Sequence, residues 1–328
     1  MSSSNKMNNI LNQVGNTPIV KLNKASEISG ANIYAKCEFL NPGGSIKDRA
    51  AKQILIKAME NGDLKKGDTF IEATAGNTGI SLTLFANALG LKSIIVMPEN
   101  QAQAKKDALK NLGAELILAP AVPLADENNF RNMAKRLSQE NGYFLADQFN
   151  NLENRNAHAE NTATEIAKQL PEINGFICSA GTGGTIGGCE IGLRKLIKDI
   201  KIGLADPDGA NLYNYYTTGE LSNNGKSSIM EGIGQSAITP NLADLKIDYA
   251  YNISDTDAVA CAFEAISEGI NAGLSSGMNI AGSIAMGKEL GKDSNILTFI
   301  CDTSDKYKEK MFNKDFLNEK GITPPNWI

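Results

Sequence analysis

The sequence predicts an α/β protein built from parallel sheets with helices on both faces. Short runs rich in β-branched residues alternate with helix-length segments along most of the 328 residues. Such alternation implies crossover connections, which make neighbouring strands parallel and cover the sheet with helices. The expected strands are 32–39, 69–72, 93–96, 115–118, 175–178, 201–205 and 296–300, and the expected helices are 50–59, 77–89, 103–112, 126–141, 156–170, 255–269 and 279–291, with one more after residue 185 that runs to 198.

Composition narrows the class of protein further. A hydrophobic content of 42% over this length is enough for two packed domains. The net charge of -5, without a dense basic run, argues against nucleic acid or an anionic membrane as the main partner. The longest apolar runs are too short to span a bilayer, and residues 1–9 lack the apolar core of a signal peptide, so we expect a cytosolic protein. Residues 206–239 break the alternation and are expected to form a long irregular excursion.

Cysteine and histidine usage does not indicate a metal site. The five cysteines form no C-x-x-C pair, and His158 is the only histidine, so neither a zinc site nor a disulfide framework is expected. We expect the cysteines to be small buried residues and His158 to lie at the surface or at the edge of the core.

The most informative stretch is the glycine-bearing loop 41–49, which places Lys47 in the first turn of a helix. Ser45, followed three residues later by Asp48, has the spacing of a capping box, and 50–59 is a helix-forming run. The positive end of a helix disfavours an ammonium group and favours a neutral amine that can form a Schiff base. Lys47 is therefore the candidate reactive residue, although an isolated lysine after a turn is more often simply solvated.

Two further loops each lie between an expected strand and an expected helix. Gly181-Thr182-Gly183-Gly184-Thr185 follows an apolar strand, and backbone N–H groups at a helix start, with glycines and hydroxyls beside them, are typical of a phosphate site. By the same argument the loop 74–79 can bind a substrate carboxylate. For the glycine-rich loop alone, a tight strand-to-helix turn without a ligand is the alternative explanation.

Two nucleotide-binding motifs and one hydrolase motif are only partly matched by this sequence. A dinucleotide fingerprint needs glycine where Ile186 stands, and the nearest approach to a Walker loop has Asp68 in place of lysine, so a single phosphate fits best. Gly273-Leu274-Ser275-Ser276-Gly277 matches the nucleophile elbow of serine hydrolases, but that fold needs a histidine after the serine, and none follows His158. A serine hydrolase and a non-catalytic phosphate-binding module remain as alternatives from other classes.

Together the three loops resemble those of the β-family of pyridoxal-phosphate (PLP) enzymes, fold type II, and especially cysteine synthase and the catalytic core of cystathionine β-synthase. The resemblance begins at 14–18 and continues through 231–234 to 275–277. It implies a fold like the tryptophan synthase β-subunit, with a smaller mobile domain of 50–147 and a larger domain of 1–49 and 148–328 that binds the cofactor phosphate.

The resemblance also implies roles for individual residues. Lys47 would hold PLP covalently and then act as the catalytic base, and Ser276 would face the pyridine nitrogen as a neutral hydroxyl. Ala75 replaces the usual serine, and Glu231 is typical of the cystathionine β-synthase branch. The full set implied by the family comprises the cofactor contacts Lys47, Asn77, Gly181, Thr182, Gly183, Gly184, Thr185 and Ser276, and the substrate contacts Thr74, Gly76, Asn77, Thr78, Gln148 and Gly232.

The activity implied by the family is β-replacement on an amino acid. The expected reaction makes L-cysteine from O-acetyl-L-serine and sulfide. The alternative is a lyase that releases sulfide from L-cysteine, either a desulfhydrase or an enzyme like cystathionine β-synthase. The family suggests a homodimer and allows serine acetyltransferase as a partner, although no residue of this chain points to that partner.

Overall fold

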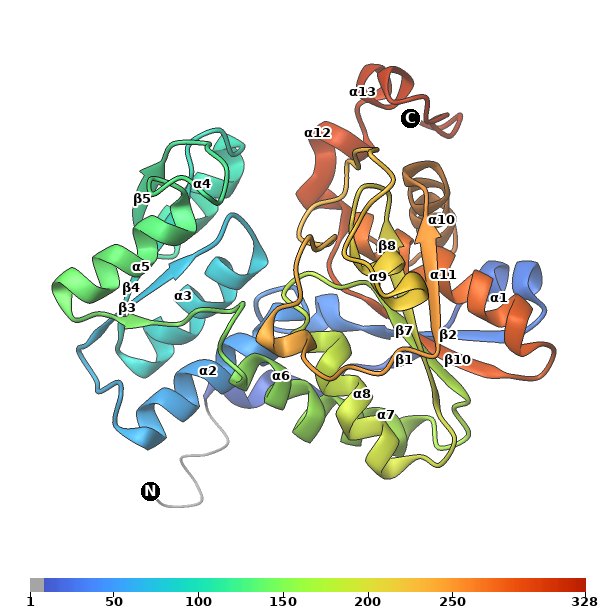
Figure 1. Ribbon diagram of the computed structural model, residues 1–328, viewed down its shortest axis with the longest axis horizontal. Helices are drawn as coiled ribbons and strands as arrows, with labels where there is room; N and C mark the ends of the chain where they lie inside the picture. The colour runs from blue at the N-terminus through green and yellow to red at the C-terminus, as the bar shows by residue number, and fades with distance from the viewer. Residues whose placement is uncertain (1–8) are drawn as a thin grey trace. The chain divides into compact units, whose positions relative to one another are not determined.

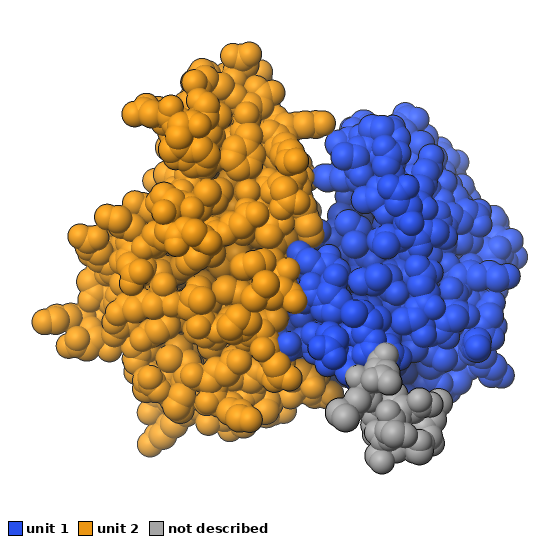
Figure 2. Space-filling view, turned by 180° about the vertical axis from the view of Figure 1, so that it is seen from behind, with its two compact units in different colours: residues 1–15, 41–157 blue, residues 16–40, 158–328 orange. Residues whose placement is uncertain are grey.

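The computed structural model describes residues 9–328, so the expectation about the first eight residues lies outside the described part. The chain divides into two compact units, shown in different colours in Figure 2. Within the described part, unit 1 comprises 9–15 and 41–157, and unit 2 comprises 16–40 and 158–328. Residues 41–49 and 148–157 therefore fold with the segment 50–147 rather than with the carboxyl-terminal unit. The predicted mobility of the smaller domain stays a prediction.

Unit 1 contains a four-stranded sheet whose strand pairs are all parallel (Figure 1). Successive side chains along its strands point into two different apolar cores. Phe70 and Ile95 face one core, and Ile71 and Val96 face the other. In spatial order the strands are β5 (Glu115–Ala119), β4 (Lys92–Pro98), β3 (Thr69–Ala73) and β6 (Phe144–Leu145).

Helices cover both faces of the sheet in unit 1. The helix that begins at Lys47 buries Ala51, Ile54, Leu55 and Ala58, spaced as one face of an α-helix requires. It packs against the helix that follows β3, while another helix covers the opposite face through Ala134. The helices are α2 (Lys47–Asn61), α3 (Asn77–Leu89), α4 (Gln103–Asn111), α5 (Phe130–Asn141) and α6 (Glu153–Ala157).

Unit 2 contains a six-stranded sheet that is parallel except at one edge (Figure 1). The central strands are almost fully buried, as expected for strands covered on both faces, and Phe176 and Phe299 meet edge to face at 5.4 Å between ring centroids. In spatial order the strands are β1 (Ile19–Lys21), β2 (Asn32–Cys37), β10 (Asn295–Ile300), β7 (Gly175–Cys178), β8 (Lys201–Pro207) and β9 (Tyr249–Ile253), with β1 antiparallel to β2.

The longest helix of unit 2 among the described residues packs across the centre of this sheet. Gly282 lets it approach β8 closely, because a Cβ there would lie 2.6 Å from that of Ala205. The helices 23–29 (α1) and 255–267 (α10) pack beside it, and the helices 163–169 (α7) and 184–196 (α8) lie on the opposite side of the sheet (Figure 1). The helices are α1 (Asn23–Ser29), α7 (Ala163–Gln169), α8 (Gly184–Leu196), α9 (Leu212–Thr218), α10 (Asp255–Ser267), α11 (Leu274–Leu290), α12 (Lys308–Met311) and α13 (Lys314–Glu319).

The predicted fold class is confirmed, with local corrections. All seven expected strands form, but β1, β6 and β9 were not expected. The excursion 206–239 is irregular only in part, because β8 extends to Pro207 and α9 lies within it. Helix α11 begins at Leu274, five residues before its expected start at 279. None of the helices in the described region is long and apolar enough to cross a membrane.

Candidate active site

Lys47 is the first residue of α2, as the sequence predicts, and its side chain is half-buried. The loop before it turns at Gly44, which has φ 74° and donates its N–H to the Asn41 carbonyl at 2.8 Å. The Asn41 side chain in turn accepts the Gly15 N–H at 2.9 Å. The glycine-bearing loop is thus fixed at its amino-terminal end before it delivers Lys47 to the helix.

Asp48 anchors this loop, but the predicted capping box is wrong. The helix starts at Lys47 with Ile46 as its N-cap, so Ser45 stands one position too early to cap the third helical N–H. The Ser45 hydroxyl instead accepts the Lys47 N–H at 3.3 Å. The fully buried Asp48 carboxylate accepts the Gly43 N–H and the Ser81 hydroxyl, both at 2.5 Å, and so ties the lysine loop to α3.

The loop 74–79 joins the end of β3 to the start of α3, where the sequence places it. Gly76 is the N-cap of α3, and its N–H donates to the Thr74 hydroxyl at 3.2 Å. Gly79 allows close packing, because a Cβ there would lie 2.9 Å from the Thr74 methyl group. Asn77 is the first residue of the helix and is half-buried. The backbone N–H groups in the first turn of α3 have no partner within the helix and point out of its N-terminus at this loop, as an anion site requires.

Gln148 is brought to this loop by the pairing of β6 with β3. Its side-chain oxygen accepts the Thr78 hydroxyl at 2.7 Å, and its side-chain nitrogen donates to Glu72 at 3.1 Å. Glu72 is a buried carboxyl group that the sequence did not single out. Burial, with a smaller effect of the nearby Asp147 charge, raises the pKa of Glu72 to about 8. Unit 1 therefore joins two predicted substrate residues and one unexpected acid in a single hydrogen-bonded chain.

The loop 181–185 in unit 2 joins β7 to α8 and is held by its neighbours on two sides. A Cβ at Gly181 would collide with the Gly232 carbonyl oxygen, and one at Gly183, which has φ 88°, would collide with Leu242. The Thr182 carbonyl accepts the Thr239 hydroxyl at 2.8 Å. Glycine is required at both positions by close packing, and the first N–H groups of α8 face away from the helix.

His158 lies directly behind this loop, which corrects the expectation of a surface or core-edge residue. It is 1% exposed and belongs to a π-helical turn, His158–Thr162. One ring nitrogen lies 3.0 Å from the Thr162 hydroxyl, and the other lies 3.3 Å from the hydroxyl of Thr185. The polar helical segment around His158 gave no sign of this, because Thr185 is distant in the sequence. His158 is thus a buried support for one hydroxyl of the predicted phosphate loop.

Ser276 is fully buried in the first turn of α11, and it is not the N-cap, which is Gly273. Its hydroxyl oxygen accepts the Cys301 N–H at 2.9 Å. The same hydroxyl donates to the Asp302 carbonyl at 3.4 Å, a long and therefore weak hydrogen bond. No strand leads directly into this turn among the described residues, and the two ring nitrogens of His158 contact threonines, so the nucleophile elbow is not formed.

The segment 231–234 packs on the loop 181–185 from the other side. The Gly234 N–H donates to the Ala180 carbonyl at 2.9 Å, and Gly232, with φ 72°, is exposed. Glu231 forms an ion pair with Lys310 of α12 at 2.9 Å, and Lys310 also donates to the Ile229 carbonyl. The residue that the sequence associates with the cystathionine β-synthase branch is therefore held by an ion pair within unit 2.

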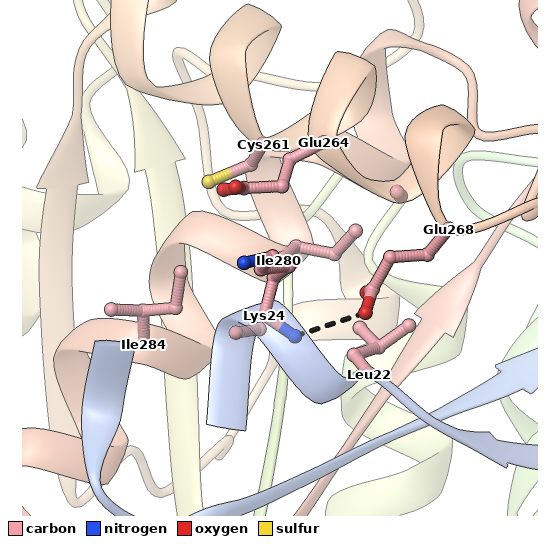
Figure 3. A pocket seen from close by; sticks show the side chains of 9 residues that line it. Leu22, Lys24, Cys261, Glu264, Glu268, Ile280 and Ile284 are labelled. Atoms are coloured by element: carbon pink, nitrogen blue, oxygen red, sulfur yellow. Dashed lines mark hydrogen bonds between the residues drawn. The ribbon is translucent and has the colours of Figure 1, made fainter. Parts of the chain in front are cut away.

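A separate depression on unit 2 lies between α1, α10 and α11 (Figure 3). It is lined by Leu22, Ile280 and Ile284 and bordered by Glu268, which accepts the Lys24 N–H at 3.1 Å. Burial raises the pKa of the Cys261 thiol at its edge to about 12, so this cysteine is not activated. No group of three or more potential metal ligands occurs in the described part of the chain.

Comparison with known proteins identifies the family. A family model described as "Pyridoxal-phosphate dependent enzyme" matches residues 10–302. The chain belongs to this family. Cysteine synthase 1 of Emericella nidulans is 40% identical over 96% of this chain and 87% of its own length. Cystathionine beta-synthase of Dictyostelium discoideum is 38% identical over 98% of this chain and 65% of its own length.

Solved structures of PLP enzymes agree with this assignment. O-ureido-L-serine synthase is 30% identical, with a TM-score of 0.85 over 94% of this chain and 95% of that chain. The O-acetylserine-dependent cystathionine beta-synthase from Helicobacter pylori is 31% identical, with a TM-score of 0.83 over 93% of this chain and 98% of that chain. The fold is therefore the α/β fold of type II PLP enzymes, and the cofactor of this family is PLP.

The residues present fit PLP. Gly181, Gly183 and Gly184 lead into the first turn of α8, whose unpaired backbone N–H groups, with the hydroxyls of Thr182 and Thr185 in the same loop, are the donors that a phosphate requires. The Lys47 amine stands at a helix start on a half-exposed residue, and Ser276 supplies a neutral hydroxyl. The donor set therefore suits one phosphate, one aldehyde and one weakly basic ring nitrogen.

Proposed function

We propose that this PLP enzyme makes L-cysteine and acetate from O-acetyl-L-serine and sulfide. The observation that carries the proposal is the placement of Lys47 at the first residue of α2, in a chain 40% identical to a cysteine synthase. The 74–79 and 181–185 motifs support it, because each leads from a strand into the first turn of a helix, where backbone N–H groups can bind an anion.

In this proposal the groups that hold the cofactor lie at or near the starts of helices. The N–H groups and hydroxyls of Gly181, Thr182, Gly183, Gly184 and Thr185 bind its phosphate, Asn77 bonds its ring hydroxyl, and Ser276 faces its ring nitrogen. When bound, PLP supplies the electron sink that weakens the Cα–H bond and the bond to the β-substituent of the amino acid. The Ser276 hydroxyl leaves the ring nitrogen uncharged, which favours elimination over transamination.

Lys47 has two proposed tasks. Its Nζ would hold the cofactor aldehyde in the absence of substrate, and once the amino group of the substrate has taken its place, Nζ would remove the proton from Cα. The α-carboxylate is held by Thr74, Gly76, Thr78 and Gln148, and Gly232 lines the mouth of the site. In the overall replacement, hydrosulfide would take the place of acetate at Cβ, and Lys47 would return to Cα the proton that it removed.

A sulfide-releasing lyase is the second candidate. Glu231 and Ala75 favour it as sequence features, and relatives named cystathionine beta-synthase match nearly the whole chain. Both candidates use the same residues and differ in the donor and acceptor. A homodimer and a cytosolic location are further parts of the proposal that rest on the sequence and the family. Light scattering tests the homodimer.

The decisive experiment measures both reactions on PLP-loaded protein. We expect sulfide consumption with O-acetyl-L-serine to be faster than sulfide release from L-cysteine, and we expect Lys47→Ala to abolish both. Borohydride reduction followed by peptide mapping should locate the cofactor on Lys47. A label on another lysine would refute the role of Lys47, and faster release would favour the lyase. A colourless protein that is active without PLP would support a hydrolase, and PLP binding without turnover would support a binding module.

A further inference from the structure

The side chain of Glu72 lies in unit 1 and is linked by hydrogen bonds to Gln148 and, through it, to Thr78, the two residues proposed above to bind the substrate carboxylate. Glu72 is 1% exposed on β3 and reaches Gln148 through both carboxyl oxygens. Its Oε1 lies 3.1 Å from the side-chain nitrogen of Gln148, and its Oε2 lies 3.4 Å from the backbone nitrogen of the same residue. The Gln148 side-chain oxygen lies 2.7 Å from the Thr78 hydroxyl. The three side chains thus form one continuous chain of hydrogen bonds.

The direction of this chain determines what Thr78 offers to a ligand. A hydroxyl has one hydrogen to donate, and in the arrangement described above Thr78 donates it to Gln148. Thr78 then presents only lone pairs, which repel a carboxylate. Gln148 donates to the ionised Glu72 and, at 3.4 Å, to the Ala73 carbonyl. With an ionised Glu72, the hydrogen bonds therefore run towards the acid and away from the substrate.

A proton on Glu72 allows the opposite direction. Oε2 accepts a backbone N–H, which can only donate, so an added proton belongs on Oε1. From there it donates to the oxygen of a Gln148 amide turned by 180°, an orientation with the same heavy-atom positions. The turned amide nitrogen donates to Thr78, and the Thr78 hydroxyl donates to the substrate. Turning the amide removes the long hydrogen bond from the Gln148 side chain to the Ala73 carbonyl.

We propose that the proton on Glu72 sets the direction of the Glu72–Gln148–Thr78 chain and thereby the affinity of the enzyme for the carboxylate of its amino-acid substrate. The inference rests on the proposed function, because it takes Thr78 and Gln148 as carboxylate ligands. Glu72 is a positioning residue in this scheme, since it acts through Gln148 and touches neither substrate nor cofactor. Substrate affinity then falls as Glu72 loses its proton.

The electrostatic surroundings of Glu72 place this change near physiological pH. Burial raises the pKa of Glu72 to about 8, and the negative charge of Asp147 adds to that rise. The Arg131 guanidinium on α5 acts in the opposite direction, as do the hydrogen bonds from Gln148. Arg131 stacks on the Phe149 ring at 3.9 Å and is itself partly desolvated. Glu72 therefore keeps its proton well above the usual range of a carboxyl group and loses it as the pH rises through about 8.

The test compares wild type with Glu72→Gln, which mimics the protonated acid. The carboxamide accepts the Gln148 backbone N–H with its oxygen and donates to the Gln148 side chain with its nitrogen. The KM for O-acetyl-L-serine is measured from pH 6.5 to 9.5 in both proteins, and their ratio cancels the titration of the substrate amine. We expect equal KM values at pH 7 and a wild-type KM about tenfold higher than that of the variant at pH 9.5. We expect kcat to change less than twofold.

A second variant separates the hydrogen-bond chain from simple charge repulsion. Thr78→Val removes the hydroxyl but leaves Glu72 and Gln148 in place. Thr78→Val should raise KM at pH 7 and make KM independent of the Glu72 proton. Thr78→Val and the double variant Glu72→Gln/Thr78→Val should therefore share one pH profile of KM. If their profiles still diverge above pH 8, the Glu72 proton acts on KM by a route other than the Thr78 hydroxyl, either through Gln148 directly or by repulsion through space, and the proposed chain is wrong.

Other outcomes separate the two proposals. A flat KM ratio between wild type and Glu72→Gln, in an enzyme that makes cysteine normally, refutes the role of Glu72 alone. A wild-type protein that binds PLP but does not turn over the amino acid refutes the proposed function, and the role of Glu72 fails with it. If Glu72→Gln does not fold, the pH profiles of KM for wild type and Thr78→Val test the proposal by themselves. The KM of wild type should then rise above pH 8 relative to that of Thr78→Val.

Discussion

The loop 181–185 of unit 2 and the loop 74–79 of unit 1 both precede a helix, but their neighbours hold them in different ways. Backbone packing fixes the first, since Cβ atoms at Gly181 and Gly183 would collide with neighbouring groups. Polar side chains fix the second, through Thr78, Gln148 and Glu72. Packing gives one rigid arrangement, whereas a hydrogen-bond chain with a titratable end has two. In the proposed function, the loop 181–185 is thus suited to permanent retention of a cofactor, and the loop 74–79 to reversible binding of a substrate.

The largest expected effect on cofactor binding comes from a substitution in the rigid loop. Gly181→Ala places a methyl group against the Gly232 carbonyl oxygen, so the loop must move. We expect PLP affinity to fall at least about 100-fold, which corresponds to about 2.7 kcal/mol. Equilibrium dialysis with the visible absorbance of bound PLP measures it.

Gly219→Ala is the control for this change. Gly219 ends α9 with φ 84°, and no atom lies within 4 Å of an added Cβ. This substitution costs about 1 kcal/mol of stability from its left-handed backbone alone and should leave PLP affinity unchanged. Equal PLP affinity in Gly181→Ala and wild type would show that the loop is not held by packing.

The second effect probes the titratable end of the substrate loop through stability. The folded-state pKa of Glu72 is raised from 4.5 to about 8, so its contribution to stability is fully present below pH 4.5 and is lost as the pH rises through about 8. Within that window the wild type should lose up to about 1.4 kcal/mol of unfolding free energy per pH unit relative to Glu72→Gln. Urea unfolding at pH 5, 6.5 and 8 measures the difference, and a constant difference would show that Glu72 does not retain its proton.

The elements and the lysine could be predicted from the sequence because their signals are local. Lys47 follows a glycine turn and precedes a helix-forming run, and the phosphate loop follows an apolar strand. Local signals failed where tertiary packing dominates. Helix α11 begins at Leu274 although Gly273 offers no side-chain cap, since the fold buries its first turn completely. The short strand β6 consists of only two residues and forms because it pairs with β3.

The supporting residues of the site could not be predicted, because distant segments create their contacts. Glu72 and Gln148 are 76 positions apart and meet only after Ile71 pairs with Leu145 across β3 and β6. His158 meets Thr185 through the packing of its π-helical turn against α8. A buried glutamate within an apolar strand is the one signal that sequence reasoning overlooked, since a carboxyl group there needs a partner.

The third effect tests the side-chain support of the rigid loop. His158→Gln keeps a polar atom near the position of the ring nitrogen that contacts Thr185, whereas His158→Asn keeps one only near the position that contacts Thr162. We expect His158→Asn to weaken PLP binding about tenfold, because the Thr185 hydroxyl loses its support. His158→Gln should restore most of the affinity. Equal affinities in the two variants would show that His158 fills space without orienting the loop.

The smallest effect concerns the outer neighbour of the phosphate loop. Glu231 and Lys310 are about one-third exposed, with side-chain exposures of 31% and 28%, so their ion pair should contribute no more than about 1 kcal/mol. Glu231→Gln should therefore lower the unfolding free energy slightly, more at low salt than at high salt, and leave PLP retention unchanged. The ratio of cysteine synthesis to sulfide release should stay within about twofold of wild type, since the packing of Gly234 and Thr239 on the loop persists. A larger shift in that ratio would show that the carboxylate of Glu231 acts on the reaction itself, and that its partnership with Lys310 is not its main role.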